Sequence, residues 1–283
     1  GLVVVPVAYS LFKKGILAHL LKEKSTTLSQ ITNEFHANEG YLNVALRVLA
    51  SQGFLKYEVD NVSGNVTITS LPISEFAFSL VPMYEDTFHL LTQSSVFTAN
   101  KMDSDSITLL EPILKKFTEN YHIHFEEDEN LRIIQEQMLT HIEGYLVGPI
   151  VVNLGMTGMF HKYFMESSFR ADEFHKHPEA FAKILDFFVH LGWFSKKNDN
   201  YQFTEDGFFF AKRASAYGVT VSYLPMFKHI DSLLFGNASE LRNIAKNEDE
   251  IHVNREMNVW GSGGAHATYF KVIDDIIIEL FNK

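Results

Sequence analysis

The sequence predicts a mainly α-helical chain that contains one folding unit twice, and three observations support this fold class. First, residues 33–55 and 172–194 align without a gap, and five of the 23 aligned positions are identical. Ordinary composition gives roughly one or two identities over such a length. Second, the blocks on either side repeat as well. Third, both copies show helical periodicity that changes to alternation after a glycine.

The identical positions define the extent of the repeat. In the central block they are Glu34/Glu173, Phe35/Phe174, His36/His175, Leu46/Leu185 and Gly53/Gly192. In the flanking blocks they are Pro6/Pro149, Leu11/Leu154, Gly15/Gly158, Ser79/Ser222, Pro82/Pro225, Met83/Met226, Leu90/Leu233 and Leu91/Leu234. A repeat of this size indicates two copies of one structural unit. We therefore predict a first repeat over 1–92, a helical connection over 93–147, a second repeat over 148–236 and a tail over 237–283.

Each copy is predicted to open with two helices. The first is apolar, has a glycine in its middle, and covers residues 7–21 in one copy and 150–164 in the other. A short helix over 28–35 follows in the first copy, with its N-cap among the serine and threonines just before it. Ser167 and Ser168 are expected to cap its counterpart in the second copy.

A longer helix and a hairpin complete each copy. The longer helix covers 39–51 in the first copy and 178–191 in the second, where Pro178 suits the first helical position. Gly53 and Gly192 are predicted to end these helices as left-handed caps. Alternation of apolar and polar residues after each glycine predicts a small β-hairpin. This order of elements is winged-helix-like.

The connection and the tail are also predicted to be helical. Periodicity favours helices over 107–117 and 131–146 between the copies, and a strong one over 268–281 at the end. In this last helix one face carries apolar residues, namely Phe270, Ile273, Ile277 and Leu280. Ile276 and Ile278 widen that face, which indicates burial on more than one side.

The overall composition excludes several classes of partner. The 283 residues carry a formal net charge of −11, which disfavours nucleic acid and anionic lipid. The predicted recognition helices each carry one Lys or Arg, Arg47 and Lys183, beside carboxylates, so we expect no DNA binding. There is no cysteine and no apolar run long enough for a membrane span, which fits a cytoplasmic protein.

Two groups of histidines are candidate sites. His122 and His124 stand in an H-x-H pattern, which on a strand would place both rings on one side, near acidic residues that could complete a divalent-metal site. The same spacing arises often by chance. His36 and His175 occupy equivalent places in the repeat, which favours a structural role at the end of the short helix.

The tail segment NVWGSGGAHATYF holds the candidate site residues Trp260, Gly261, Ser262, Gly263, Gly264 and His266. Its glycines permit close backbone approach or positive φ. Known phosphate-loop patterns are absent, so a tight joint between domains with substrate contacts is favoured over a nucleotide loop. His266 is expected to open the last helix. Two readings remain open for it, a functional side chain and a buried capping histidine.

Two parts of the chain carry a family resemblance. Residues 9–68 resemble the winged-helix dimerisation domain of small-molecule O-methyltransferases, through the apolar opening helix and the Leu49–Leu55 ending. The stretch NVWGSGGAHATYFKVIDDIIIELFN is similar to the segment preceding the methyltransferase core in polyketide synthase loading modules of the apratoxin and saxitoxin type. On this resemblance residues 1–283 are the adaptor region, and the last helix leads into the core.

The resemblance implies a function and partners. It implies a non-catalytic adaptor or lid that docks to a methyltransferase core and helps to shape an acyl-carrier-bound substrate site. S-adenosylmethionine would belong to that core, because its glycine-rich turn and acidic ribose ligand are expected after residue 283. No catalytic residue is therefore expected in this chain, and a homodimer through the winged-helix faces is plausible by analogy. The alternatives are a self-contained enzyme with a histidine site and a winged-helix regulator.

Overall fold

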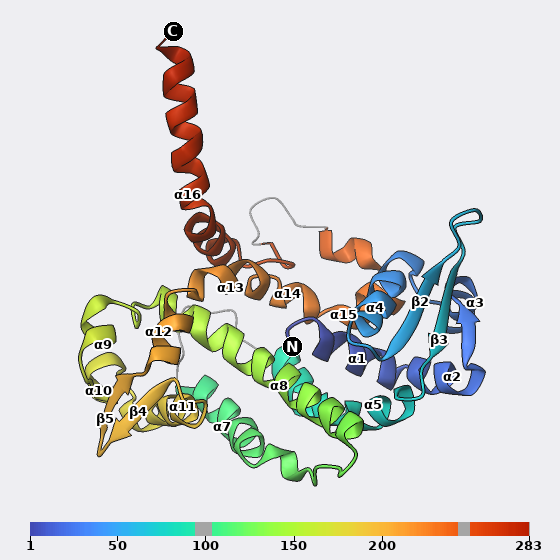
Figure 1. The fold of residues 1–283 in the computed structure, drawn as a ribbon, viewed down its shortest axis with the longest axis horizontal. Coiled ribbons are helices and arrows are strands. Elements are labelled where there is room, and N and C mark those ends of the chain that lie inside the picture. The colour runs from blue at the N-terminus through green and yellow to red at the C-terminus, as the bar shows by residue number, and fades with distance from the viewer. Residues whose placement is uncertain (94–103, 243–249, 283) are drawn as a thin grey trace. The chain divides into compact units, whose positions relative to one another are not determined.

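The fold is described from a computed structural model of the chain, and the description covers residues 1–93, 104–242 and 250–282 (Figure 1). The described residues fall into two compact units built from separate segments. The first unit draws on Gly1–Ser94, Leu109–Val147 and Pro225–His252, and the second on Ser95–Thr108, Gly148–Leu224 and Val253–Lys283. Both units are mainly helical and each contains a small antiparallel sheet, which confirms the predicted fold class.

The first unit contains the first winged-helix-like copy and helices from later in the chain. Its copy consists of α1 (Val4–Lys13), α2 (Ile16–Glu23), β1 (Ser25–Thr27), α3 (Leu28–Phe35), α4 (Glu39–Ser51), β2 (Leu55–Val59) and β3 (Val66–Ser70). It is followed by α5 (Ser74–Leu80), η1 (Val81–Tyr84) and α6 (Glu85–Gln93). The later elements are most of α7 (Ser104–Thr118), η2 (Asn120–His122), the first part of α8 (Glu129–Met156), α15 (Ile230–Phe235) and η3 (Ala238–Arg242).

The opening helix of the first copy is broken, which corrects the prediction of one helix over 7–21. Gly15 adopts a φ of 85°, so α1 ends before it and α2 begins after it. A left-handed residue cannot continue a right-handed helix, and glycine adopts this conformation without steric cost. The second copy shows the same break, because Gly158 has a φ of 95° between α8 and α9 (Lys162–Glu166).

The short and the longer helix of the first copy have the predicted bounds. Thr27 is the N-cap of α3, where its hydroxyl accepts a hydrogen bond from the backbone N–H of Gln30 at 3.3 Å. The side chain of Gln30 in turn accepts from the backbone N–H of Thr27 at 2.9 Å, which completes a capping box. The face of α4 that carries Leu42, Leu46 and Leu49 is fully buried in the core.

The wing of the first copy is a three-stranded antiparallel sheet in the order β1-β3-β2 (Figure 1). Its register pairs Thr26 with Ile68 and Tyr57 with Ile68. Ile68 is buried on the core side of the central strand, whereas the hairpin tip at Val62 is exposed. Alternation along β2 and β3 therefore places one face of the hairpin on the helices.

The second unit contains the second copy up to Leu224 and the C-terminal helix. Its elements are the last part of α8, α9, α10 (Ala171–Phe174), α11 (Pro178–His190), β4 (Phe194–Lys197), β5 (Asn200–Phe203), α12 (Glu205–Ala211), α13 (Ala214–Val221) and α16 (Arg255–Phe281). The short helix α14 (Leu224–Phe227) lies at the boundary between the units in the sequence. The core of this unit is rich in aromatic rings, with Phe169, Phe181 and Phe188 fully buried.

Equivalent residues of the two copies make equivalent local structure. Gly53 and Gly192 have φ values of 79° and 78°, which confirms the left-handed caps. After each glycine, a backbone N–H returns to the last turn of the helix, from Phe54 to Leu49 at 3.2 Å and from Trp193 to Phe188 at 2.9 Å. His36 and His175 are likewise the C-cap residues of α3 and α10, although their backbone conformations differ. These local matches support the duplication, and superposition of the whole copies stays a prediction.

The start of the short helix in the second copy differs from the prediction. Ser167 and Ser168 do not cap α10, because its N-cap is Arg170. The backbone N–H of Arg170 donates to the carboxylate of Glu173 at 2.9 Å. Phe169, just before this cap, exchanges backbone hydrogen bonds with Tyr201 of β5, so the preceding serines are held in an extended approach to the sheet.

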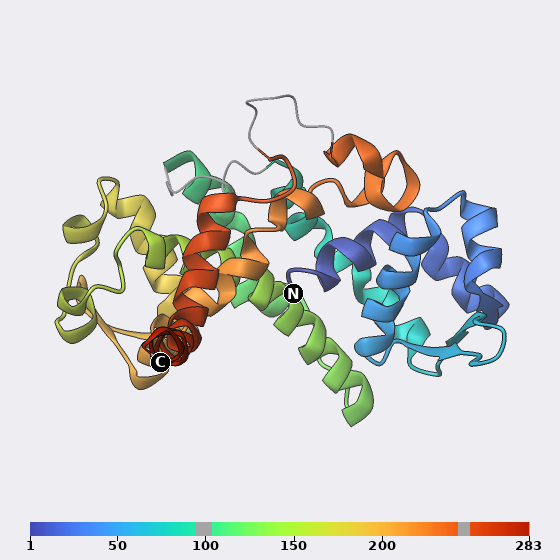
Figure 2. The same cartoon turned by 90° about the horizontal axis from the view of Figure 1, so that it is seen from above.

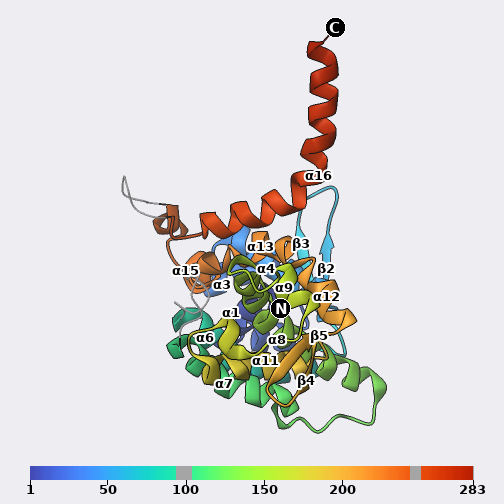
Figure 3. The ribbon, with the colours of Figure 1, turned by 90° about the vertical axis from the view of Figure 1, so that its left-hand side faces the viewer.

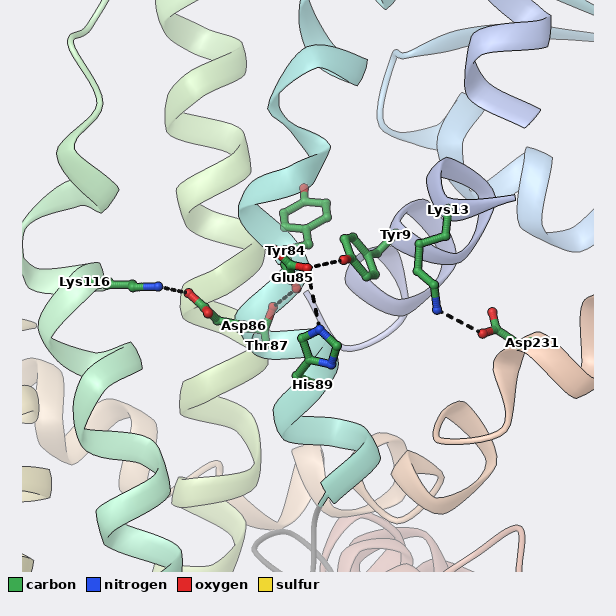
Figure 4. Close-up of polar contacts among 9 residues, drawn as sticks. All are labelled: Tyr9, Lys13, Tyr84, Glu85, Asp86, Thr87, His89, Lys116 and Asp231. Atoms are coloured by element: carbon green, nitrogen blue, oxygen red, sulfur yellow. Dashed lines mark hydrogen bonds and ion pairs between the residues drawn. The ribbon is translucent and has the colours of Figure 1, made fainter. Parts of the chain in front are cut away.

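In the first unit, polar contacts connect α1 to its neighbours (Figure 4). The hydroxyl of Tyr9 donates to Glu85 of α6 at 3.0 Å, and burial raises the pKa of Tyr9 to about 12. The ammonium of Lys13 lies 3.3 Å from the carboxylate of Asp231 in α15, which also accepts from the hydroxyl of Ser10. Helix α15, from the last part of the second repeat, therefore contacts the first helix of the chain.

No single helix within the described residues is long and apolar enough to cross a membrane. One pair, α1 and α2, meets the length and composition requirement only when taken together, and it is bent by 75° at the break.

A buried hydrogen-bond network lies where α8 packs in the first unit. The hydroxyl of Tyr84 is 2.6 Å from Nδ1 of His141, and Nε2 of the same ring is 2.8 Å from the side-chain oxygen of Gln52. The side-chain amide of Gln137 donates to the carbonyl of Gln52 at 3.1 Å. Burial lowers the pKa of His141 to about 4, so its ring is neutral at pH 7 and each nitrogen has a partner.

This network predicts acid-sensitive stability. The unfolded chain binds a proton at His141 near the ordinary imidazole pKa of about 6.5, whereas the folded chain resists it. The contribution of neutral His141 to the free energy of unfolding is therefore fully present above about pH 6.5. It falls by about 3 kcal/mol as the pH drops toward 4. The His141→Gln variant should therefore show a smaller loss over this range in urea unfolding. The Tyr84→Phe variant, which keeps the titrating ring, should retain the slope. An unchanged slope in His141→Gln would contradict the assignment.

Candidate functional site

The glycine-rich tail segment lies inside helix α16, which corrects its prediction as a joint between domains. The helix begins at Arg255, well before the predicted start at residue 268, and His266 lies within it. Asn254 is the N-cap, and its side-chain oxygen accepts from the backbone N–H of Met257 at 3.0 Å. Each interior glycine costs roughly 1 kcal/mol of helix propensity, so packing must offset this cost.

That packing is a close crossing of α16 over α13. A Cβ atom added to Gly261 would lie 2.7 Å from the backbone nitrogen of Val219 and 2.8 Å from Cα of Gly218. A Cβ added to Gly218 would in turn lie 2.9 Å from Cα of Gly261. Real side chains do not tolerate such distances, so two glycines face each other and the helix backbones touch. The close backbone approach expected of Gly261 is thus observed, between helices of one unit.

The residues around Gly261 anchor the same face of α16. The indole of Trp260 lies against Gly155 and Gly218, at 3.0 Å from the position of a Cβ on either one. Met257 is fully buried, and the side-chain amide of Asn258 donates to the hydroxyl of Ser222 at 2.9 Å. The first turns of α16 are therefore held by apolar and polar contacts within the second unit.

The C-terminal half of α16 carries a different surface. Its side chains are exposed, from Tyr269 to Phe281, which is 88% exposed. Seven of them recur at helical spacing and cover an arc of about 140° around the axis. We call them the α16 stripe, which consists of Tyr269, Phe270, Ile273, Ile276, Ile277, Leu280 and Phe281. The predicted apolar face of this helix is thus present, but it is open to solvent.

Helix α16 is bent, and its two halves run in different directions. Figure 3 shows the first turns lengthwise across the view and the later turns rising away from the other helices of the second unit. In Figure 2 the last turns are seen end-on. Sharp bends in helices arise at proline or at glycine and serine, and the Gly-Ser-Gly-Gly run at 261–264 is the sequence of this kind in α16.

The predicted site residues fall on both faces of α16. Trp260 and Gly261 face their own unit, whereas Ser262, Gly263 and His266 do not take part in that contact. Gly263 is exposed, and Ser262 donates to the carbonyl of Val259 in the preceding turn at 3.3 Å. Gly264 lies in the same helix, between Gly263 and His266.

His266 is exposed and does not open a helix. The centroid of its ring is 6.3 Å from that of Tyr269 and 6.0 Å from that of Phe270. It therefore extends the α16 stripe by one turn toward the glycines. The reading of His266 as a buried capping residue is wrong, because an interior helix position leaves no terminal N–H or C=O to cap.

His122 and His124 do not share a strand, so the geometry expected for a paired metal site is not formed. His122 ends the short helix η2 with a φ of 56°, and its ring lies 3.4 Å from the carboxylate of Glu119. Over the described residues, we find no group of three or more His, Asp or Glu side chains arranged to hold a metal ion. The histidine-based alternative combined His122 with His266, and these residues belong to different compact units.

Over its described residues, the longer helix of the second copy, α11, carries no cluster of Lys or Arg side chains. Its exposed residues include Glu179, Lys183 and Asp186, and the carboxylate of Asp186 accepts from Lys196 of β4 at 2.6 Å. A recognition helix needs free cations or amides toward phosphates and bases. The expectation that this chain does not bind DNA stays a prediction.

Sequence reasoning missed Gly155 and Gly218, which receive Trp260 and Gly261. Both stand in the middle of apolar helical segments, where an isolated glycine weakens the helix and therefore indicates a packing reason. That signal was available in the sequence. The partner of each glycine was not, because the contacts join segments far apart in the chain.

Three family models match separate parts of the chain. Residues 1–57 match the AprA N-terminal domain, residues 143–237 the AprA winged helix domain and residues 250–283 the AprA MT2-like domain. The chain is similar to an AprA-type polyketide synthase loading region. This confirms the resemblance drawn from the sequence. No curated protein matches the chain.

The second copy and helix α16 match different AprA-type domains. The AprA winged helix domain covers the second copy from the end of α8 to α15. The AprA MT2-like match coincides with α16 and the residues just before it. The helix that crosses α13 through glycines is therefore also similar to a part of a methyltransferase-type domain.

The glycine crossing predicts opposite effects for two matched substitutions. Gly261→Ala forces a Cβ into the backbone of α13 and should lower the free energy of unfolding by roughly 1–3 kcal/mol. Gly263→Ala, whose Cβ would meet no described atom within 4 Å, should leave stability unchanged or raise it by up to about 1 kcal/mol. Urea unfolding of both variants is the measurement. Equal stability of the two variants would contradict the crossing.

Proposed function

We propose that this chain is the non-catalytic adaptor region of an AprA-type polyketide synthase loading module. In this proposal the α16 stripe docks to a methyltransferase core, and S-adenosylmethionine is the cofactor of that core. The adaptor itself supplies position and shape. The second copy and the glycine crossing hold α16, and α16 presents an apolar surface to the core.

One observation carries the proposal: residues that match an AprA MT2-like domain form a helix whose apolar side chains are exposed. Contiguous exposed apolar surface in a folded protein marks a site of interaction. Full burial of one branched or aromatic side chain is worth about 1.5–3 kcal/mol. Seven such side chains leave a large favourable free energy for whichever surface covers them.

The two faces of α16 support a division of roles. Met257, Trp260 and Gly261 hold the helix to its own unit, and the α16 stripe begins about two turns later. Ser262, Gly263 and His266 lie between these regions, so they are the residues we propose to meet the core first. A site for the acyl group on a carrier protein would then be shaped where this part of the helix meets the core.

Binding measurements on charge-introducing variants test the docking. The binding partner is an AprA MT2-like domain produced without the segment that corresponds to residues 250–283. The Ile277→Asp variant should bind it at least about 30-fold more weakly than the parent chain, because a buried apolar anchor is worth ~2 kcal/mol. The matched control is Asp275→Asn on the opposite side of the same helix, which should bind like the parent chain. Isothermal titration calorimetry gives both constants.

Ile277 is exposed in this chain, so the variant should fold normally, and circular dichroism checks this. Equal binding by Ile277→Asp and the parent chain would overturn docking through the α16 stripe. The carrier-protein part of the proposal is tested separately, by titrating the assembled pair with an acyl carrier protein that bears its phosphopantetheine arm.

A further inference from the structure

The C-terminal half of α16 is apolar well beyond the α16 stripe. Val272 and Ile278 stand on opposite flanks of the stripe and are 56% and 57% exposed. With them, apolar side chains span about 240° of the helix circumference, interrupted by Asp274. The remaining arc is a narrow strip of polar residues, which are Lys271, Asp275, Glu279 and Asn282.

This width separates two ways of covering the helix. A two-helix seam needs apolar residues at only two of seven positions, and Phe270, Ile273, Ile277 and Leu280 would provide it. That seam extends over about two heptads, which is shorter than the three to four heptads typical of a coiled coil. It would leave Ile276, Ile278 and Val272 in water. A helix that is apolar around most of its circumference is instead buried among several elements.

We infer that the C-terminal half of α16 is embedded between at least two elements of the methyltransferase core, as one of the helices of that domain's own layers. This inference rests on the proposed function and goes beyond it, since docking alone would need only a contact along the stripe. Because residues 250–283 themselves match an AprA MT2-like domain, the occupant we infer is the remainder of that domain. The polar strip is the part of the helix that stays in solvent.

Embedding has a consequence for the adaptor. The first turns of α16 are fixed on α13 by the Gly218–Gly261 contact, and the later turns would be fixed inside the core. One helix would then belong to two domains. The core would be connected to the adaptor by one helix that bends at its Gly-Ser-Gly-Gly run, and not by a flexible linker.

Single cysteines test the inference, because the chain contains none of its own. Four variants are made, Ile277→Cys in the stripe, Val272→Cys and Ile278→Cys on its flanks, and Asp275→Cys on the polar strip. Each is labelled with a maleimide in the full 283-residue chain, with and without a saturating AprA MT2-like domain from which the segment corresponding to residues 250–283 has been removed. All four positions are exposed without the partner, so labelling should start fast.

We expect the partner to slow labelling at 277, 272 and 278 by at least tenfold and to leave labelling at 275 unchanged. Protection at 277 alone would overturn embedding while leaving docking through the stripe intact. If the partner slows labelling at none of the four positions, both the inference and the proposed function are overturned. Protection at 275 equal to that at 278 would also overturn the inference, because it leaves no solvent-facing strip.

Discussion

The contact between Gly218 and Gly261 determines where the C-terminal helix can lie. Two helix backbones touch there, and neither position accepts a Cβ atom without displacing the other helix. Trp260 fills the space beside the contact over Gly155, and Asn254 and Asn258 add hydrogen bonds to the Ser222 region. The crossing fixes the first turns of α16, and the exposed distal half begins after the bend that follows them.

The crossing also explains how a helix with weak propensity persists. Three glycines within four residues would favour a loop in an isolated peptide. In this chain, burial of Met257 and the fit of Trp260 offset that cost on one side of the helix. The other side has no such support within the second unit, yet it is apolar from Tyr269 onward. In the proposed function, a methyltransferase-type domain covers this surface. The match of the same residues to an AprA MT2-like domain supports that proposal.

Local signals predicted the repeated units well. The bounds of α3 and α4 followed from a threonine cap and from leucines at helical spacing, and the left-handed Gly53 and Gly192 followed from their place after such helices. These features depend on residues within a few positions of each other. The break at Gly15 was missed because a glycine inside an apolar run is compatible with both a continuous helix and a turn.

The candidate site was predicted only in part, for a physical reason. Close backbone approach was expected at its glycines and is observed at Gly261, whereas the surroundings of Gly263 are open and the segment was assigned to a joint. Its helical state is supported by the contacts of Gly261 with Gly218 and of Trp260 with Gly155, which are 43 and 105 positions apart (261 − 218 and 260 − 155). Such contacts cannot be read from the composition of the segment. The apolar face of the last helix was predicted from periodicity, whereas its exposure became visible only in the fold.

Hydrogen exchange of α16 amides tests the central claim most directly, with and without an AprA MT2-like domain produced without the segment that corresponds to residues 250–283. The amides from Met257 to Gly261 should already exchange slowly in the chain alone, because the crossing with α13 protects them. Those from Tyr269 to Phe281 should exchange fast alone and become slow when the domain is added. Exchange over Tyr269–Phe281 that is the same in both samples would contradict the account.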